Sequence, residues 1–514
     1  MCRFICVALA VSTLAAPAPL DAAWHKASSK HFVIYSEQKP EQLRQFAEKL
    51  ERFDQAVRKV RGSSDPPIGD GNRLTVIVVK STSAVQRLSR DKSGTVYGFY
   101  TPRYTGSHAF VPARADEDRQ GGLNATTVFF HEYSHHMMFQ EANIPFPNWF
   151  IEGFAELFST AKIEKDNSVI LGTSPAHRAF GLFSSEGLSS REVLEDQPAK
   201  LSATDRESIY GRGWLLTHYL SFEPTRKGQL ASYLNKLTAG EEMGASAREA
   251  FGDLKQLDRE LNNYVRRRSL SAVSIPATAL KIGPIDITPL GPGGDEVMEW
   301  HIMSKRGVNK KEADTVAGKI RGIAGRYPNE ALVQVSLAEA EFDVGNFSAA
   351  VAAADKAAKA DPKLVEALTF KGRALIELAL KGNDGKGFSA ARNAYLTANK
   401  IDPEDPEPLF LFFDSFRQEG KAPTRNAIAA LHYSSVLAPQ DSMVRTTSAV
   451  AFLNDGKLED ARRELLPIAF NPHGGKISEQ ARVAVQLLDA KDRTGAVEAL
   501  AKVSPEVDPS GDGK

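Results

Sequence analysis

The sequence contains almost no cysteine: Cys2 and Cys6 are the only two among 514 residues. Both lie in a short N-terminal stretch that carries a positive charge, then an apolar run, then small residues, as secretory signal peptides do. We therefore predict residues 1–23 as a signal peptide and a mature protein that is secreted across the inner membrane, periplasmic or extracellular. An uncleaved N-terminal anchor is the alternative. The mature chain would have no thiol, which excludes disulfides and cysteine-ligated zinc.

An excess of charge of either sign is also missing. Lys+Arg and Asp+Glu both number 64, and no basic cluster is interleaved with aromatic residues. This composition argues against binding to nucleic acid. After the N-terminal stretch no run has the length and apolarity of a bilayer span, so we expect no stable membrane span. A length of 514 residues predicts two or three domains.

The strongest pattern present lies between Val128 and Phe158. It contains His131-Glu132-Tyr133-Ser134-His135, an H-E-x-x-H motif. Residues four apart on a helix share a face, so His131 and His135 can ligate one metal ion, and Glu132 can reach a water on that ion. A hydrolytic zinc site needs three protein ligands and an open position, and Glu152 is the obvious third ligand. The pattern predicts a Zn²⁺ site.

The context of the motif favours a site over a chance match. Asn124 is a plausible N-cap for the first helix, and a second helix is predicted over residues 149–160. Glu156 follows Glu152 by four residues on that second helix, so it can accept a ring N–H from a ligating histidine and fix its tautomer.

These two motifs, HEYSH and WFIEGFAE, resemble those of the gluzincin zinc metallopeptidases, closest to the peptidase MA-like group of bacterial proteins. The resemblance implies an α+β zincin-like catalytic domain, a mixed sheet plus active-site helices, over residues 24–270. It makes His131, His135 and Glu152 the zinc ligands, Glu132 the general base and Glu156 the acid behind a ligand. It also implies that a hairpin around Gly98–Ala109 pairs with the substrate backbone, an ordinary surface hairpin being the alternative.

A tyrosine extends this likeness. Related peptidases carry one in a Tyr-x-x-Gly context at the start of a later helix, and Tyr210-Gly211-Arg212-Gly213 matches. The resemblance makes Tyr210 a catalytic donor to the oxyanion, and an aromatic residue on a packed helix is the alternative. Arg212 could assist or bind a substrate carboxylate. We do not predict His108, His136 or His218 as ligands.

Hydrophobic periodicity outlines the rest of this domain. It predicts strands at 31–36, 74–79, 96–101 and 108–112, helices at 42–61, 83–88, 208–222 and 229–268, a hairpin at 161–172 and a loop to about residue 200. Residues 271–296 are rich in proline and glycine and are predicted as a linker.

Alanine-rich paired helices follow from residue 297. Pro328, Pro362, Pro403, Pro439 and Pro472 are separated by 34, 41, 36 and 33 residues, close to the tetratricopeptide period of about 34. We predict residues 297–505 as an all-α tetratricopeptide-repeat (TPR) solenoid and 506–514 as a disordered tail. A generic helical bundle is the alternative.

Together these features predict a zinc-dependent peptidase with a peptide or protein substrate and a solenoid that binds a protein partner. Endopeptidase action is favoured because the Tyr97–Pro102 segment lacks the glutamate with which aminopeptidase-N-type enzymes hold a substrate amine. The alternative is a catalytically inactive peptidase-fold TPR scaffold that acts in envelope protein assembly.

Overall fold

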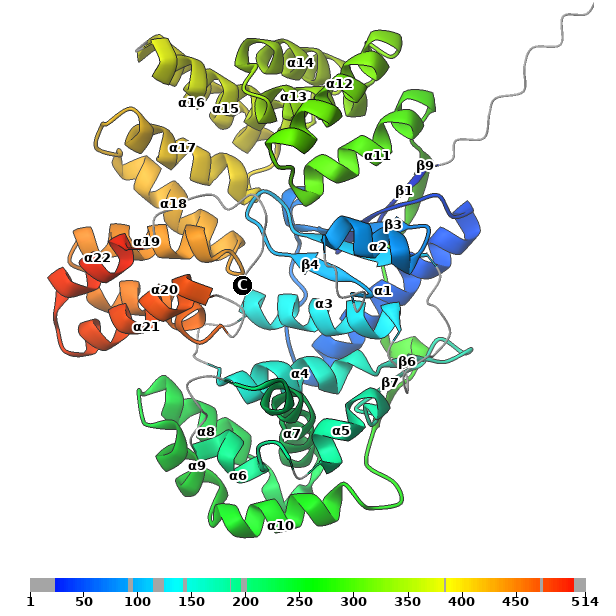
Figure 1. Ribbon diagram of the computed structural model, residues 1–514, viewed down its shortest axis with the longest axis vertical. Helices are drawn as coiled ribbons and strands as arrows, with labels where there is room; N and C mark the ends of the chain where they lie inside the picture. The colour runs from blue at the N-terminus through cyan, green and yellow to red at the C-terminus, as the bar shows by residue number, and fades with distance from the viewer. Residues whose placement is uncertain are drawn as a thin grey trace, which may run out of the picture.

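A computed structural model describes residues 24–90, 96–113, 124–141, 146–184, 186–195, 201–382, 385–471 and 475–502. The predicted signal peptide, the predicted tail and Pro472 lie outside these residues. Among the helices described here, none is long and apolar enough to cross a membrane. Figure 1 shows a central sheet with helices on both sides and a curved array of helices that continues from it.

The central sheet is mixed and has the strand order β4-β5-β3-β2-β1-β9. β2, β3 and β5 run parallel, whereas β4, β1 and β9 pair antiparallel to their neighbours. The mixed sheet was predicted, and β4 lies at one of its edges. The strands are β1 (His25–Ser28), β2 (Phe32–Ser36), β3 (Leu74–Val79), β4 (Phe99–Thr101), β5 (His108–Pro112) and β9 (Asp286–Pro289).

Strand β3 shows how both faces of the sheet are covered. Successive side chains of a strand point to opposite faces. Leu74, Val76 and Val78 belong to the main core with the helices on one face. Ile77 and Val79 belong to a second cluster on the other face. This explains why residues 76–79 of the predicted strand are all apolar.

Helices of the N-terminal part cover the sheet and extend below it (Figure 1). The predicted helix over 229–268 is three helices, because Gly240 and Gly252 adopt positive φ between them. The predicted loop up to residue 200 contains a 3₁₀ turn, η2 (Ala176–Arg178), and two short helices. The helices are α1 (Pro40–Arg61), α2 (Thr82–Ser89), α3 (Ala125–Glu141), α4 (Asn148–Ser159), α5 (Ala179–Phe183), α6 (Ser190–Glu195), α7 (Ala203–Phe222), α8 (Gln229–Thr238), α9 (Met243–Phe251) and α10 (Leu254–Tyr264).

The segment predicted as a linker, 271–296, contributes a strand to the central sheet and another to a second, 3-stranded sheet of order β6-β7-β8. Its strand β8 (Val273–Ile275) pairs with β7 (Val169–Leu171), which also pairs with β6 (Lys162–Ile163). Its strand β9 pairs with β1 at the edge of the central sheet, with Pro289 opposite His25. Proline is compatible with an edge strand because its missing N–H can face away from the ladder. The prolines therefore mark the ends of strands here.

The predicted all-α solenoid is confirmed as a TPR-like array in which successive helices pack on one another, and it begins at Pro292 instead of 297. Gly345, Gly420 and Gly456 adopt positive φ in the turns inside three helix pairs. Its helices are α11 (Pro292–Arg306), α12 (Lys310–Arg326), α13 (Ala331–Asp343), α14 (Phe347–Ala360), α15 (Val365–Gly382), α16 (Gly385–Ile401), α17 (Pro406–Gln418), α18 (Arg425–Leu437), α19 (Ser442–Asn454), α20 (Leu458–Ala469), α21 (Gly475–Asp489) and α22 (Arg493–Ala501).

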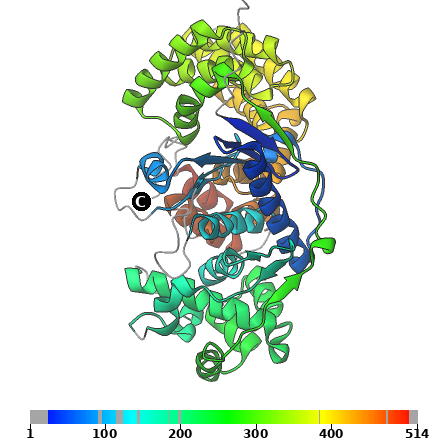
Figure 2. The ribbon, with the colours of Figure 1, turned by 90° about the vertical axis from the view of Figure 1, so that its right-hand side faces the viewer.

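The solenoid packs against the N-terminal part from its first helix onward. Met298 and Ile302 of α11 lie in the same apolar cluster as Trp24, Ile77 and Phe110. From this contact the array curves around the sheet, as the two perpendicular views show (Figures 1 and 2).

Candidate metal centre

Helix α3 carries the H-E-x-x-H motif and is enclosed by apolar side chains. Asn124 caps it as predicted: its Oδ1 accepts a hydrogen bond from the Thr127 backbone N–H at 3.0 Å. Phe130 stacks on Phe53 of α1 with 3.8 Å between ring centroids, and Tyr133 donates to Asp54 Oδ1 at 2.8 Å. These contacts fix the rotation of α3, so that His131 and His135 face α4.

Helices α4 and α7 cross at very short range, which requires glycine at the crossing. A Cβ atom on Gly153 would lie 2.2 Å from the Gly213 carbonyl oxygen, and one on Gly213 would lie 2.4 Å from the Trp149 carbonyl oxygen. Glu152 of α4 and Tyr210 of α7 are close neighbours of these glycines in the chain. The crossing therefore fixes the two side chains relative to each other.

The structure brings His131, His135 and Glu152 together. Their donor atoms form a triangle: His131 Nε2 lies 3.1 Å from His135 Nε2, and Glu152 Oε2 lies 3.4 and 3.5 Å from these two nitrogens. Zinc bonds of about 2.0–2.1 Å in tetrahedral geometry place ligand atoms about 3.3 Å apart. Two imidazoles and one carboxylate in this triangle fit a zinc ion with an open fourth position.

The electrostatics of the triangle favour a cation. Burial lowers the pKa of His131, but its interactions with the Glu152 and Glu156 carboxylates outweigh burial and raise that pKa to about 10. A carboxylate environment that stabilises a proton on the imidazole also stabilises a metal cation, and metal binding displaces the proton.

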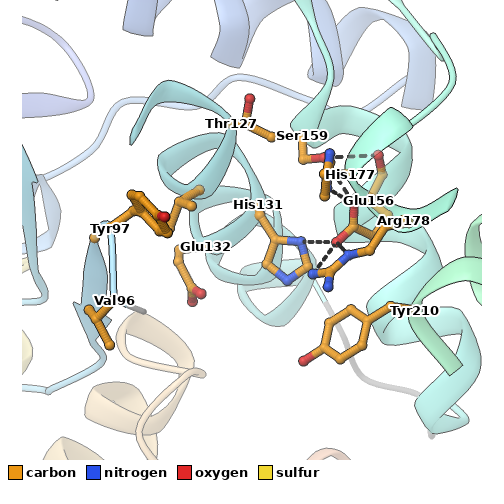
Figure 3. Close-up of a pocket in the computed structure, with 12 residues that line it drawn as sticks. Val96, Tyr97, Thr127, His131, Glu132, Glu156, Ser159, His177, Arg178 and Tyr210 are labelled. Atoms are coloured by element: carbon orange, nitrogen blue, oxygen red, sulfur yellow. Dashed lines mark hydrogen bonds and ion pairs between the residues drawn. The ribbon is translucent and has the colours of Figure 1, made fainter. Parts of the chain in front are cut away.

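Glu156 lies behind the triangle and contacts one of its imidazoles. Its Oε1 is 3.2 Å from His131 Nδ1, the ring nitrogen that faces away from the triangle. The same carboxylate accepts a hydrogen bond from Arg178 Nε at 2.8 Å and lies 3.0 Å from His177 Nε2 (Figure 3). Burial raises the pKa of Glu156, but His131, His177 and Arg178 hold it well below the usual range. The side chain is a buried anion placed to orient His131, the role predicted for it.

A pocket of about 240 Å³ opens beside His131. Glu132 and Tyr210 direct their polar ends to the same open side of His131 in Figure 3. Burial, followed by the charge on Glu152, raises the pKa of Tyr210, so its hydroxyl keeps its proton and can donate a hydrogen bond. The lining residues are Val96, Tyr97, Gly98, Thr127, Val128, His131, Glu132, Glu156, Ser159, His177, Arg178 and Tyr210.

His177 and Arg178 are the site residues that the sequence did not predict. Both belong to η2, inside the segment predicted as a loop. The Arg178 guanidinium lies 4.2 Å from the centre of the Tyr210 ring and also binds Glu156, so it links the tyrosine to the carboxylate behind His131. No motif spacing connects these residues, because they approach Glu156 only through the fold.

His108, His136 and His218, which were not predicted as ligands, have partners away from the triangle. His136 is buried, with its Nδ1 2.7 Å from the Tyr100 hydroxyl of β4. His108 Nδ1 lies 2.9 Å from the Gly106 carbonyl oxygen, and His218 Nε2 lies 3.0 Å from the carbonyl oxygen of Gly172. Burial lowers the pKa of His136 and of His108 to about 3, so both rings are neutral.

Arg212 also lies outside the site. Its guanidinium donates to Asn262 Oδ1 at 2.8 Å, toward α10. It does not line the pocket beside His131, so the structure gives it no contact with the predicted site.

A second group of potential ligands, His31, Asp54 and Asp65, is found among the described residues. Lys30 and Arg58 already form ion pairs with its carboxylates, and Glu51 lies 2.7 Å from His31 Nδ1. Cations of the protein neutralise this cluster, so we assign it a structural role.

Comparisons with known proteins do not assign a family. Neither a scan against protein families nor a search of curated proteins finds a match. Among solved structures the chain is similar to a TPR protein of Thermus thermophilus (15% identity, TM-score 0.31, 41% of this chain and 100% of that chain). It is also similar to PilF of Pseudomonas aeruginosa (17%, 0.32, 42% and 94%) and to yeast Tom70 (13%, 0.26, 73% and 76%). At these TM-scores the assignment of the solenoid rests on its own helix pairs.

Proposed function

We propose that this chain is a secreted or periplasmic zinc-dependent peptidase of the gluzincin type. One observation carries the proposal: the donor atoms of His131, His135 and Glu152 form a triangle with sides of 3.1, 3.4 and 3.5 Å beside a pocket. A bound zinc ion supplies Lewis acidity toward a carbonyl oxygen and toward water.

Each polar group of the pocket has a step in peptide hydrolysis. The Glu132 carboxylate takes the proton of the attacking water and returns it to the leaving amine. The Tyr210 hydroxyl donates a hydrogen bond to the oxygen on which negative charge develops. Strand β4 is an edge strand next to the pocket, so it can pair with an extended substrate backbone. This pairing suits endopeptidase action.

Two measurements test the proposal. The purified chain should bind one zinc ion, and His131→Ala, His135→Ala or Glu152→Ala should reduce the zinc content. Glu132→Gln should keep zinc and lower the rate of peptide hydrolysis by at least about 10²–10⁴, because an amide cannot accept the proton. Glu164→Gln, at an exposed position of the β6–β7 hairpin, is the matched control. It should leave the zinc content and the rate of peptide hydrolysis unchanged. Absence of zinc uptake, or full activity in Glu132→Gln, contradicts the proposal.

The second candidate function is that of a non-catalytic TPR scaffold in envelope protein assembly. The observation that favours it is the size of the solenoid, which continues from α11 to α22, since such arrays present extended binding surfaces to protein partners. A chain that holds zinc, cleaves no unfolded protein or peptide and retains a protein partner after His131→Ala supports the scaffold.

A further inference from the structure

The segment that leads directly into strand β4 forms part of the wall of the candidate active site. Val96, Tyr97 and Gly98 line the pocket, and the strand itself begins at the next residue, Phe99. β4 is short, and within the part of the chain that the structure describes it pairs on one side only, with β5. A strand of this length has few backbone hydrogen bonds of its own, so its position depends on what holds its ends.

Helix α3 holds β4 from the side of the zinc ligands. The Tyr100 hydroxyl lies 2.7 Å from His136 Nδ1, and His136 directly follows His135. The two rings meet edge to face, with 5.6 Å between centroids. This contact fixes the strand relative to α3.

The solenoid holds the other end of the strand through the β4–β5 loop, residues 102–107. Arg103 donates hydrogen bonds from Nη1 to the Lys305 carbonyl oxygen at 3.1 Å and from Nη2 to the Arg306 carbonyl oxygen at 3.2 Å, at the end of α11. Gln440 Nε2, before α19, donates to Ser107 Oγ at 3.4 Å. Residues more than 300 positions later in the chain thus contact the loop of the hairpin.

Tyr104 is the centre of this contact. Its ring packs on Phe410 of α17 with 4.7 Å between centroids and joins the apolar cluster of helices α15 to α19. Its backbone N–H donates to Asp441 Oδ2 at 2.8 Å. The other oxygen of Asp441 accepts from the backbone N–H groups of Met443 and Val444 and caps α19. One buried carboxylate therefore joins a solenoid helix to the β4–β5 loop.

We propose that the solenoid positions the substrate-binding edge of the peptidase. Helices α11, α17 and α19 contact the β4–β5 loop and so fix β4 beside the candidate zinc site. The role of β4 in binding substrate rests on the proposed function, whereas the contacts between the solenoid and the β4–β5 loop do not. Figure 1 places β4 inside the curve formed by these three helices. This part of the solenoid holds a segment of its own chain, so a protein partner would use another part of its surface.

Replacement of Tyr104 tests the proposal in the full-length chain. Tyr104→Ala removes the ring from the α17 contact, and Tyr104→Phe keeps the ring. Tyr433→Ala removes a tyrosine that is 43% exposed on α18 and is the matched control. In Tyr104→Ala we expect amide hydrogen exchange over residues 99–101 to become about tenfold faster, with exchange in α3 and α13 unchanged. Tyr104→Phe and Tyr433→Ala should exchange like the wild-type chain.

Peptide hydrolysis gives the second readout. Tyr104→Ala should raise KM about tenfold, because main-chain pairing supplies affinity, with kcat and zinc content close to wild type. Unchanged exchange in β4 of Tyr104→Ala overturns the proposal, whatever the activity. Faster exchange with unchanged KM also overturns it, since β4 would then not be a substrate edge. If the wild-type chain hydrolyses no peptide, the exchange result still decides whether the solenoid positions β4, and only the proposed function fails.

Discussion

Glu156 shows at the scale of single residues how the candidate site is assembled. Its buried carboxylate faces His131, accepts from Arg178 and contacts His177. A carboxylate behind a ligating histidine orients the ring and increases its basicity. Arg178 in turn covers the Tyr210 ring. The orientation of His131 and the position of Arg178 over the Tyr210 ring therefore both depend on the Glu156 carboxylate.

Glu156→Gln should weaken zinc binding by about 10–100-fold. The amide keeps the volume of the side chain but lacks the negative charge that supports His131 and balances Arg178. Zinc affinity measured by competition with a chelator checks this, with the exposed Glu164→Gln as control. An unchanged affinity would mean that Glu156 serves the packing of α4 alone.

Tyr210→Phe should lower kcat by about 10²–10³, the effect of losing one oxyanion donor. The ring remains in place for Arg178, so zinc content and the stability of the fold should not change. The reduction should be no larger than that in Glu132→Gln. A kcat equal to wild type would assign Tyr210 to packing, the alternative that the sequence left open.

At the scale of elements, the crossing of α4 and α7 decides the geometry. Gly153→Ala would place a methyl group against the Gly213 carbonyl. We expect a loss of about 1–3 kcal/mol in the free energy of unfolding, as for other overpacked contacts, together with reduced zinc affinity as Glu152 moves. Gly318→Ala is the matched control, because nothing lies within 4 Å of a Cβ at that position of α12. Equal stability of the two variants would contradict the close crossing.

The start of β2 is tied to α1 by a pH-dependent contact. Burial lowers the pKa of His31, but Glu51 and Asp54 outweigh burial and raise it. Burial raises the pKa of Glu51, but His31 outweighs burial and lowers it. The stabilisation from charged His31 is complete below its unfolded pKa, about 6.5, and is lost as pH rises through the folded value. The stabilisation from the charged Glu51 carboxylate is lost as the pH falls through the lowered pKa that Glu51 has in the folded chain.

His31→Gln should therefore destabilise the chain more at about pH 6 than at about pH 10, since His31 is charged only on the acid side of its raised pKa. Denaturant unfolding at the two pH values measures the difference. In a Glu51→Gln background the dependence on pH should shrink. If the free energy of unfolding of the variant differed from that of the wild type by the same amount at all pH values, the charged pair would be ruled out.

At the scale of the whole molecule, the solenoid is part of the fold of the N-terminal domain. Met298 and Ile302 of α11 complete the cluster on the second face of the sheet. Arg90, at the end of α2, donates to the Gly307 carbonyl oxygen at 3.0 Å. Cutting the chain before α11 would expose part of this face of the sheet to water, because Met298 and Ile302 would leave the cluster while Val85 of α2 remains.

A chain that ends at Gly291 should be at least about 3 kcal/mol less stable than the full chain, because two large apolar side chains leave the sheet and each is worth about 1.5–3 kcal/mol. Thermal or denaturant unfolding measures this. A chain that ends at Phe470 and lacks only α21 and α22 is the control and should keep the stability of the sheet. Equal stability of the chain ending at Gly291 would show two independent domains.

The sequence by itself determined the local features. Residues four apart on one helix must share a face, so spacing alone predicted that His131 and His135 lie together. The largely apolar stretch 74–79 is likewise a local signal, and the prolines of the helical array recur at a nearly constant spacing. The strand β3 and the helix pairs from α13 onward appear where these signals placed them.

Only the tertiary structure decided which distant segments meet. His177 and Arg178 reach Glu156, β9 joins β1, and the loop at Tyr104 enters the solenoid at Phe410. None of these contacts has a period or a fixed spacing, because each depends on the packing of elements far apart in the chain. Local spacing thus predicted the histidine pair on α3 and the glutamate pair on α4. The burial of apolar faces between distant elements brought the two pairs together and placed His177 and Arg178 beside Glu156.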